Sequence, residues 1–118
     1  MEERRTSPRH ALRPALAGRL IFPGIARPIY VAVLDVSTSI VGLYLPRPPE
    51  QSETMFLELL EGPVALRRLF ELRVFFVRSA ADGGHLVGGA LANSFTDAEL
   101  DALLGARPSE PEVVKRTA

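Results

Sequence analysis

Two short polar clusters, set in an otherwise apolar sequence, carry residue types that bind anionic ligands. They comprise Arg4, Arg5 and Arg9 near the start of the chain, and Asp35, Ser37 and Ser39 further on. A guanidinium group matches the geometry of a phosphodiester through two parallel hydrogen bonds. A carboxylate accepts from the N1 and N2 donors of guanine, and a neighbouring hydroxyl satisfies a further polar atom. The two clusters together predict a site for an anionic guanine nucleotide.

Six apolar runs separated by turn residues predict the β-strands that must position these clusters. They cover residues 16–22, 29–34, 41–45, 55–60, 70–76 and 85–92. The second run is β-branched and apolar almost throughout, as in a strand covered on both faces, and it delivers Asp35 and Ser37 to its end. Along the fifth run, alternation places every second residue from Phe70 to Phe76 on the core face. Six antiparallel strands of this length are typical of a small closed barrel, which leaves no exposed edge.

One helix is predicted after the strands. Thr96 and Glu99 form a T-x-x-E capping box at its start, and Gly105 ends it. Its apolar stripe, which should lie on the barrel, consists of Leu100, Leu103 and Leu104. We therefore divide the chain into a flexible N-terminal arm (1–14), a barrel with its helix (15–105) and a flexible tail (106–118).

Composition narrows the class of protein further. A chain of 118 residues, 47% of them hydrophobic, is suited to one small core. The formal net charge is zero, so no overall field draws the chain to DNA or to an acidic membrane. The absence of cysteine excludes disulfides, thiol catalysis and cysteine-ligated metals. No apolar run approaches the ~18 residues that span a bilayer, and the N-terminus lacks a signal-peptide core, so we expect a cytoplasmic protein.

The order and spacing of the two clusters resemble the PilZ domain family. The residues that carry the resemblance are Arg4, Arg5 and Arg9 as an R-x-x-x-R motif with a preceding arginine, then Asp35 and Ser37, then Gly42, Leu43, Tyr44 and Leu45. The resemblance extends over roughly residues 3–104. The family pattern for the second cluster is [D/N]-x-S-x-x-G. Here Ile40 stands at the position of that glycine, and Gly42 follows two residues later.

The resemblance implies an all-β fold, a small six-stranded antiparallel barrel with one C-terminal α-helix, and a receptor for cyclic di-GMP. In such a site Arg5 and Arg9 bind phosphates and stack on guanine faces, with Arg4 as an auxiliary. The N-terminal arm is expected to be mobile when the site is empty and to fold over the bound ligand. A protein partner, which the sequence does not identify, would then sense the docked arm.

On the barrel side, the resemblance implies that Asp35 and Ser37 read the guanine edges. Ser39 and Gly42 complete the predicted ligand-binding set. The same polar residues are also turn formers, since Asp and Ser at a strand end accept from nearby backbone N–H groups. Ile40 supports a second interpretation, a degenerate PilZ domain that binds no nucleotide and acts as a protein–protein interaction module.

Catalysis and nucleic-acid binding are disfavoured. By residue type, a catalytic triad could be formed from Ser37, Asp82 and His85, but the sequence has no nucleophile elbow. We therefore expect that the protein is not an enzyme, and we expect no cofactor. His10 and His85 lie far apart without a third ligand, so we expect no metal. Binding to a nucleic acid polymer needs exposed aromatic side chains, whereas most phenylalanines here are predicted on core faces.

Overall fold

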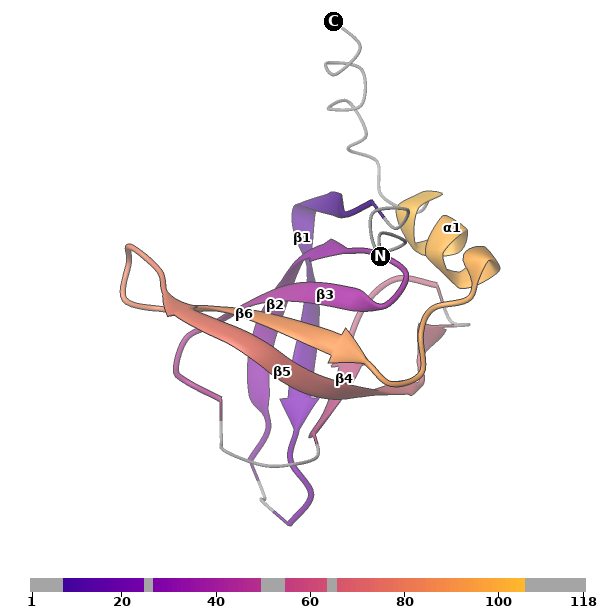
Figure 1. The fold of residues 1–118 in the computed structure, drawn as a ribbon. Coiled ribbons are helices and arrows are strands. Elements are labelled where there is room, and N and C mark those ends of the chain that lie inside the picture. Colours follow the sequence, from indigo (N-terminus) through magenta and orange to yellow (C-terminus); the bar gives the residue numbers. More distant parts are fainter. Residues whose placement is uncertain (1–7, 25–26, 50–54, 64–65, 106–118) are drawn as a thin grey trace, which may run out of the picture.

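A computed structural model describes residues 8–24, 27–49, 55–63 and 66–105. Its elements are β1 (His10–Ile21), β2 (Ile29–Val36), β3 (Ile40–Leu45), β4 (Met55–Leu59), β5 (Leu69–Ser79), β6 (His85–Leu91) and α1 (Asp97–Gly105). The strands form one closed antiparallel barrel in the order β1-β2-β3-β6-β5-β4, with the helix beside it (Figure 1). The predicted six-stranded barrel with one C-terminal helix is therefore confirmed.

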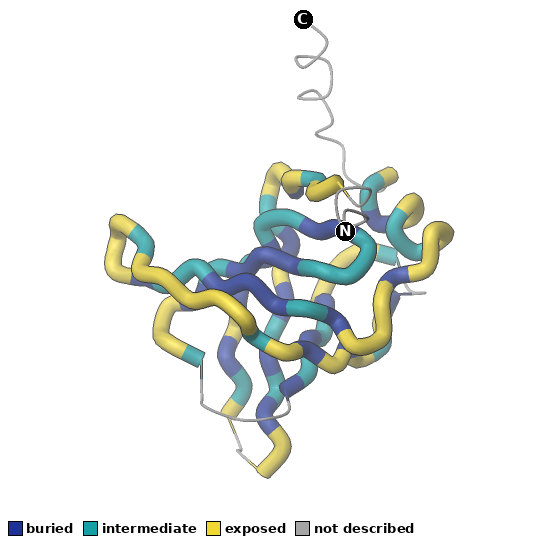
Figure 2. Tube along the Cα trace, in the orientation of Figure 1, coloured by how far each residue is buried: buried dark blue, intermediate teal, exposed yellow. Residues whose placement is uncertain are grey.

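Aliphatic side chains fill the barrel because alternate residues of each strand point inward. In β4, for example, Met55, Leu57 and Leu59 are buried and the residues between them are half-buried. Phe22 and Phe70 are the largest fully buried side chains. Buried positions run along the strands of the barrel, whereas the hairpin between β5 and β6 projects from it and is largely exposed (Figure 2).

The helix has the predicted cap and the predicted buried face. The Thr96 N–H donates to Glu99 Oε1 at 2.9 Å, and the Glu99 N–H donates to Thr96 Oγ1 at 3.0 Å, which satisfies two backbone donors of the first turn. Leu103 is fully buried, and Leu100 and Leu104 pack against the same core. In the described part of the chain, no helix has the length and apolar content needed to cross a membrane.

The first strand begins earlier than predicted. It starts at His10, not at residue 16, so the predicted boundary between arm and barrel falls inside β1. The pairing of β1 with β2 shifts in register between Ala11 and Leu16. Exposed Arg13 and Pro14 lie in this irregular stretch and interrupt the apolar alternation that the prediction relied on. Residues 1–7 and 106–118, which include half of the predicted arm and the whole predicted tail, lie outside the described residues.

The fifth strand departs from simple alternation. Its register against β6 shifts between Val74 and Phe76, so β5 carries one extra residue, as at a β-bulge. A one-residue shift exchanges the faces of the residues that follow it. Phe70 and Leu72 are buried as predicted, but Phe76 is 44% exposed, and its placement on the core face was wrong. Phe75 is also exposed, which leaves two adjacent rings at the surface.

Candidate functional site

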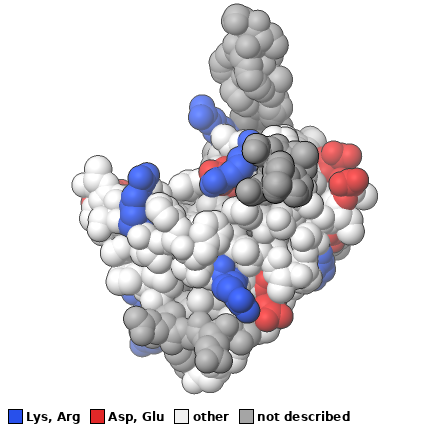
Figure 3. All heavy atoms as spheres, viewed as in Figure 1, with Lys and Arg blue, Asp and Glu red and all other residues white. Residues whose placement is uncertain are grey.

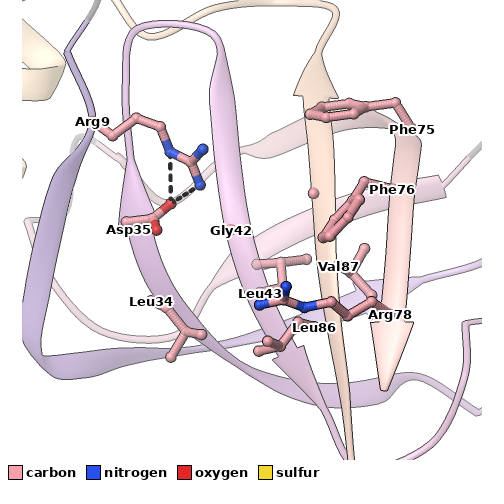
Figure 4. A pocket seen from close by; sticks show the side chains of 11 residues that line it. Arg9, Leu34, Asp35, Gly42, Leu43, Phe75, Phe76, Arg78, Leu86 and Val87 are labelled. Carbon is pink, nitrogen blue, oxygen red and sulfur yellow. Dashed lines mark hydrogen bonds and ion pairs between the residues drawn. The ribbon is translucent and has the colours of Figure 1, made fainter. Parts of the chain in front are cut away.

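A pocket of about 380 Å³ opens over β2, β3, β6 and β5. Arg9 and Asp35 line one side of it, and Phe75, Phe76 and Arg78 of β5 line the other (Figure 4). In the space-filling view, one basic group lies beside the projecting hairpin, and another lies next to an acidic group nearer the middle of the face (Figure 3). The pocket therefore combines cationic margins with apolar and aromatic walls.

The floor of the pocket is a row of directly paired residues. Asp35 pairs with Gly42, Gly42 with Gly88, and Gly88 with Phe76, across β2, β3, β6 and β5. The two central positions present only backbone. A Cβ added to Gly42 would lie 2.6 Å from Asp35 Oδ1, and one added to Gly88 would lie 3.2 Å from Phe75 Cζ. The carboxylate and the ring thus occupy the space that side chains at the two glycines would need.

Arg9 and Asp35 meet at the edge of this floor. Arg9 donates to Asp35 Oδ1 from Nη2 at 2.8 Å and from Nε at 3.2 Å. Pairing of His10 with Val36 and of Ala11 with Asp35 places the start of β1 beside the end of β2, which brings the two side chains together. The side chains are 53% and 29% exposed, so the ion pair adds little to stability, and its guanidinium and carboxylate remain accessible from solvent.

Ser37 and Ser39 lie in the turn between β2 and β3 and do not line the pocket. Ser37 is 2% exposed, and its Oγ accepts from the Ile40 N–H at 3.2 Å while its own N–H donates to the Ile40 carbonyl at 2.8 Å. The Ser39 carbonyl accepts from the Leu91 N–H at 2.8 Å. The turn-forming role of Ser37 is thus visible, while contact of either serine with a ligand stays a prediction.

The remaining predicted site residues are Gly42, Arg4 and Arg5. Gly42 lines the pocket, whereas Arg4 and Arg5 lie outside the described residues. Ile40 is a half-buried residue at the start of β3, and no non-glycine residue in the described part of the chain has a positive φ. The position at which the family has its glycine therefore needs no left-handed backbone here. Within this motif, Gly42 is the residue whose missing side chain shapes the pocket.

Sequence reasoning did not include Phe75, Phe76, Arg78 and Gly88 in the site. A signal was present, since two adjacent phenylalanines in an otherwise alternating strand indicate a bulge, and a glycine in the partner strand permits close backbone approach. The pocket exists only because the hairpin brings these residues opposite Arg9.

The hairpin that carries the aromatic wall is fixed to β3 at its tip. The Tyr44 hydroxyl donates to Asp82 Oδ2 at 2.9 Å, and Asp82 Oδ1 accepts from the Gly84 N–H at 3.0 Å. The hydrogen bond from the Gly84 amide is the main reason that the pKa of Asp82 lies below its usual value, and the hydrogen bond from the Tyr44 hydroxyl is the second. The Tyr44–Asp82 hydrogen bond also raises the pKa of Tyr44. Gly83 makes the turn with a φ of 96°. Within the described ranges, no group of three or more His, Asp or Glu residues could hold a metal ion.

Comparison with known proteins gives the class of the fold. No protein-family model matches the sequence, and no curated protein matches it at a significant level. A solved structure of the PilZ domain of YcgR from Escherichia coli, with c-di-GMP, is similar to this chain with a TM-score of 0.63 at 14% identity, covering 98% of this chain and 97% of that one. The chain is therefore a PilZ-like domain in fold.

The Bacillus subtilis inhibitor of motility (MotI/DgrA) is also similar. Its structure matches with a TM-score of 0.63 at 12% identity and covers 94% of this chain. This chain spans about half of that protein, 52% of its length. At such identities the similarity establishes the shared fold alone.

Proposed function

We propose that this chain is a non-enzymatic receptor for cyclic di-GMP. The observation that carries the proposal is the pairing of Arg9 with Asp35 at the edge of a pocket floored by glycine backbone. The two side chains have the chemistry that a guanine nucleotide requires, a fork for phosphate and a carboxylate for the guanine N1 and N2 donors. The structure of the E. coli YcgR PilZ domain with c-di-GMP supports the same ligand for this fold.

In the proposed complex, Arg9 turns its outer N–H groups to a phosphate while Asp35 keeps its orientation. Arg5, with Arg4 as an auxiliary, adds further guanidinium groups from the N-terminal arm. A pocket of about 380 Å³ lies within the range of small-molecule sites, and its exposed rim allows a larger ligand to extend over the surface. Docking of the arm on the ligand is the conformational signal that a protein partner reads. A cytoplasmic location follows from this messenger role.

Calorimetric titration with cyclic di-GMP, beside GTP and cyclic di-AMP, tests the proposal. Arg9→Ala should weaken binding by about tenfold to more than a hundredfold, because a charge-assisted hydrogen bond contributes roughly 1.5–3 kcal/mol. Arg73→Ala is the matched control, since Arg73 is an exposed arginine of β5 that does not line this pocket. Equal binding by the parent and Arg9→Ala would refute the assignment of Arg9.

Hydrogen exchange tests the docking of the N-terminal arm separately from ligand binding. Exchange over residues 4–9 should slow when cyclic di-GMP saturates the chain, because two occupied guanidinium groups would hold this segment on the barrel. Unchanged exchange despite binding would remove the docking step and leave the receptor assignment intact. Absence of cyclic di-GMP binding by the parent chain would favour the second interpretation, a PilZ-like module that binds only protein.

A further inference from the structure

Two adjacent phenylalanines of β5 are held at the surface on the side of the pocket. Phe75 is 59% exposed and Phe76 is 44% exposed, and both line the pocket. Burial of an aromatic ring is among the largest stabilising contributions a side chain makes, so neighbouring exposed rings in a concave site indicate a binding surface. Alternation along β5 already places Phe75 outward, and the bulge after Val74 moves Phe76 off the core face as well.

These rings stand beside the glycine floor. Phe76 pairs directly with Gly88, and the Phe75 ring lies where a side chain at position 88 would project. Gly42, which pairs with Gly88, extends the glycine floor as far as Asp35. A planar group inserted over this floor would have an aromatic ring against its face and the Asp35 carboxylate near its edge. This arrangement fits a guanine base, which has a flat apolar face and donors along one edge.

Arg78 adds a cation on the same wall. Its guanidinium carbon lies 5.8 Å from the centre of the Phe76 ring, within the range of a cation–π contact. The side chain runs from β5 across the pocket toward Leu43 (Figure 4). Among the described residues, Arg78 forms no ion pair, in contrast to Arg9 with Asp35. Its charge is thus available to an anionic ligand.

We propose that Phe75, Phe76 and Arg78 form a second subsite, which stacks on one guanine of cyclic di-GMP and binds the adjoining phosphate. This inference rests on the proposed function and extends it to the side of the pocket opposite Arg9 and Asp35. A cyclic dinucleotide has two bases and two phosphates around one ring, so cations on opposite margins neutralise both phosphates. Stacking accepts any base, so the selection of guanine remains with Asp35.

Calorimetry on single variants tests the subsite. Phe75→Ala, Phe76→Ala and Arg78→Ala should each weaken cyclic di-GMP binding by roughly fivefold to a hundredfold, the range found when a stacking residue is removed. Phe76→Tyr keeps the ring and should bind within about twofold of the parent. Tyr30→Ala is the matched aromatic control, because Tyr30 is 60% exposed on β2 and does not line the pocket.

A second measurement needs no substitution. Guanine stacking should shift the ring-proton resonances of Phe75 and Phe76 upfield when cyclic di-GMP is added to the parent chain, whereas those of Tyr30 should stay in place. If the parent binds, Arg9→Ala weakens binding, and neither the β5 variants nor these ring resonances change, the subsite is refuted while the proposed function stands. If the parent binds no cyclic di-GMP, both are refuted.

Discussion

Replacing Gly42 with alanine tests whether the bare pocket floor is what organises the site. The added Cβ would lie 2.6 Å from Asp35 Oδ1, so the carboxylate must retreat by about 0.8 Å to reach ordinary contact. Such a movement would separate it from Arg9 Nη2, now at 2.8 Å, and would also raise the floor under the ligand. We expect cyclic di-GMP affinity to fall by about tenfold to a hundredfold, as for the loss of one charge-assisted contact.

The stability of this variant should change little. The φ of Gly42 is not positive, so alanine is allowed there, and the exposed Arg9–Asp35 pair contributes less than about 1 kcal/mol to folding. A melting temperature within about 5 °C of the parent is expected. Gly105→Ala is the control, because a Cβ at this helical glycine meets nothing within 4 Å.

A double-mutant cycle makes the test specific to the clash. Asp35→Ala removes the atoms that a Cβ at position 42 would meet, so adding Gly42→Ala to Asp35→Ala should cost much less affinity than adding it to the parent. Calorimetry and thermal melts on the four proteins supply both readouts. Unchanged affinity in Gly42→Ala, or a cost that is the same in both backgrounds, would contradict the argument that the carboxylate position depends on the glycine.

Other predictions concern residues of the barrel and of its helix that contribute to stability. Ile40→Gly should lower the free energy of unfolding by about 1–3 kcal/mol in a denaturant melt, because Ile40 is half-buried in an ordinary strand conformation. It should not tighten cyclic di-GMP binding, and tighter binding would show that the family glycine is required at this position. Leu103→Ala should cost about 2–5 kcal/mol by the same assay, since Leu103 is fully buried, and a loss below about 1 kcal/mol would mean that the helix is not part of the core. Arg68, followed by the Thr96 N–H, lowers the pKa of Glu99 from its ordinary 4.5, so this stabilisation is complete above that pH and is lost as the pH falls through the lower folded value. Melts from pH 7 to 3 should therefore show a smaller acid loss in Glu99→Gln than in the parent, and equal losses would contradict the assignment.

Much of the fold could be predicted because it depends on local patterns. Apolar alternation and turn residues located six strands, and the T-x-x-E box located the helix within a residue or two. Where a strand contained an interruption, as at Pro14 in β1, or an extra residue, as after Val74 in β5, the local pattern failed. Part of the candidate site was predictable for a similar reason, since Arg9, Asp35 and Gly42 lie in or next to short motifs.

The assembly of the candidate site depends on contacts between distant segments. Arg9 meets Asp35 because β1 pairs with the end of β2, and Gly42 and Gly88 form one floor because β3 and β6 are in register. Residue types and spacing specify which segments become strands and which side chains have ligand chemistry. They do not specify which residues of two strands face one another, because a one-residue bulge such as the one in β5 shifts the register and exchanges the faces of the residues that follow it.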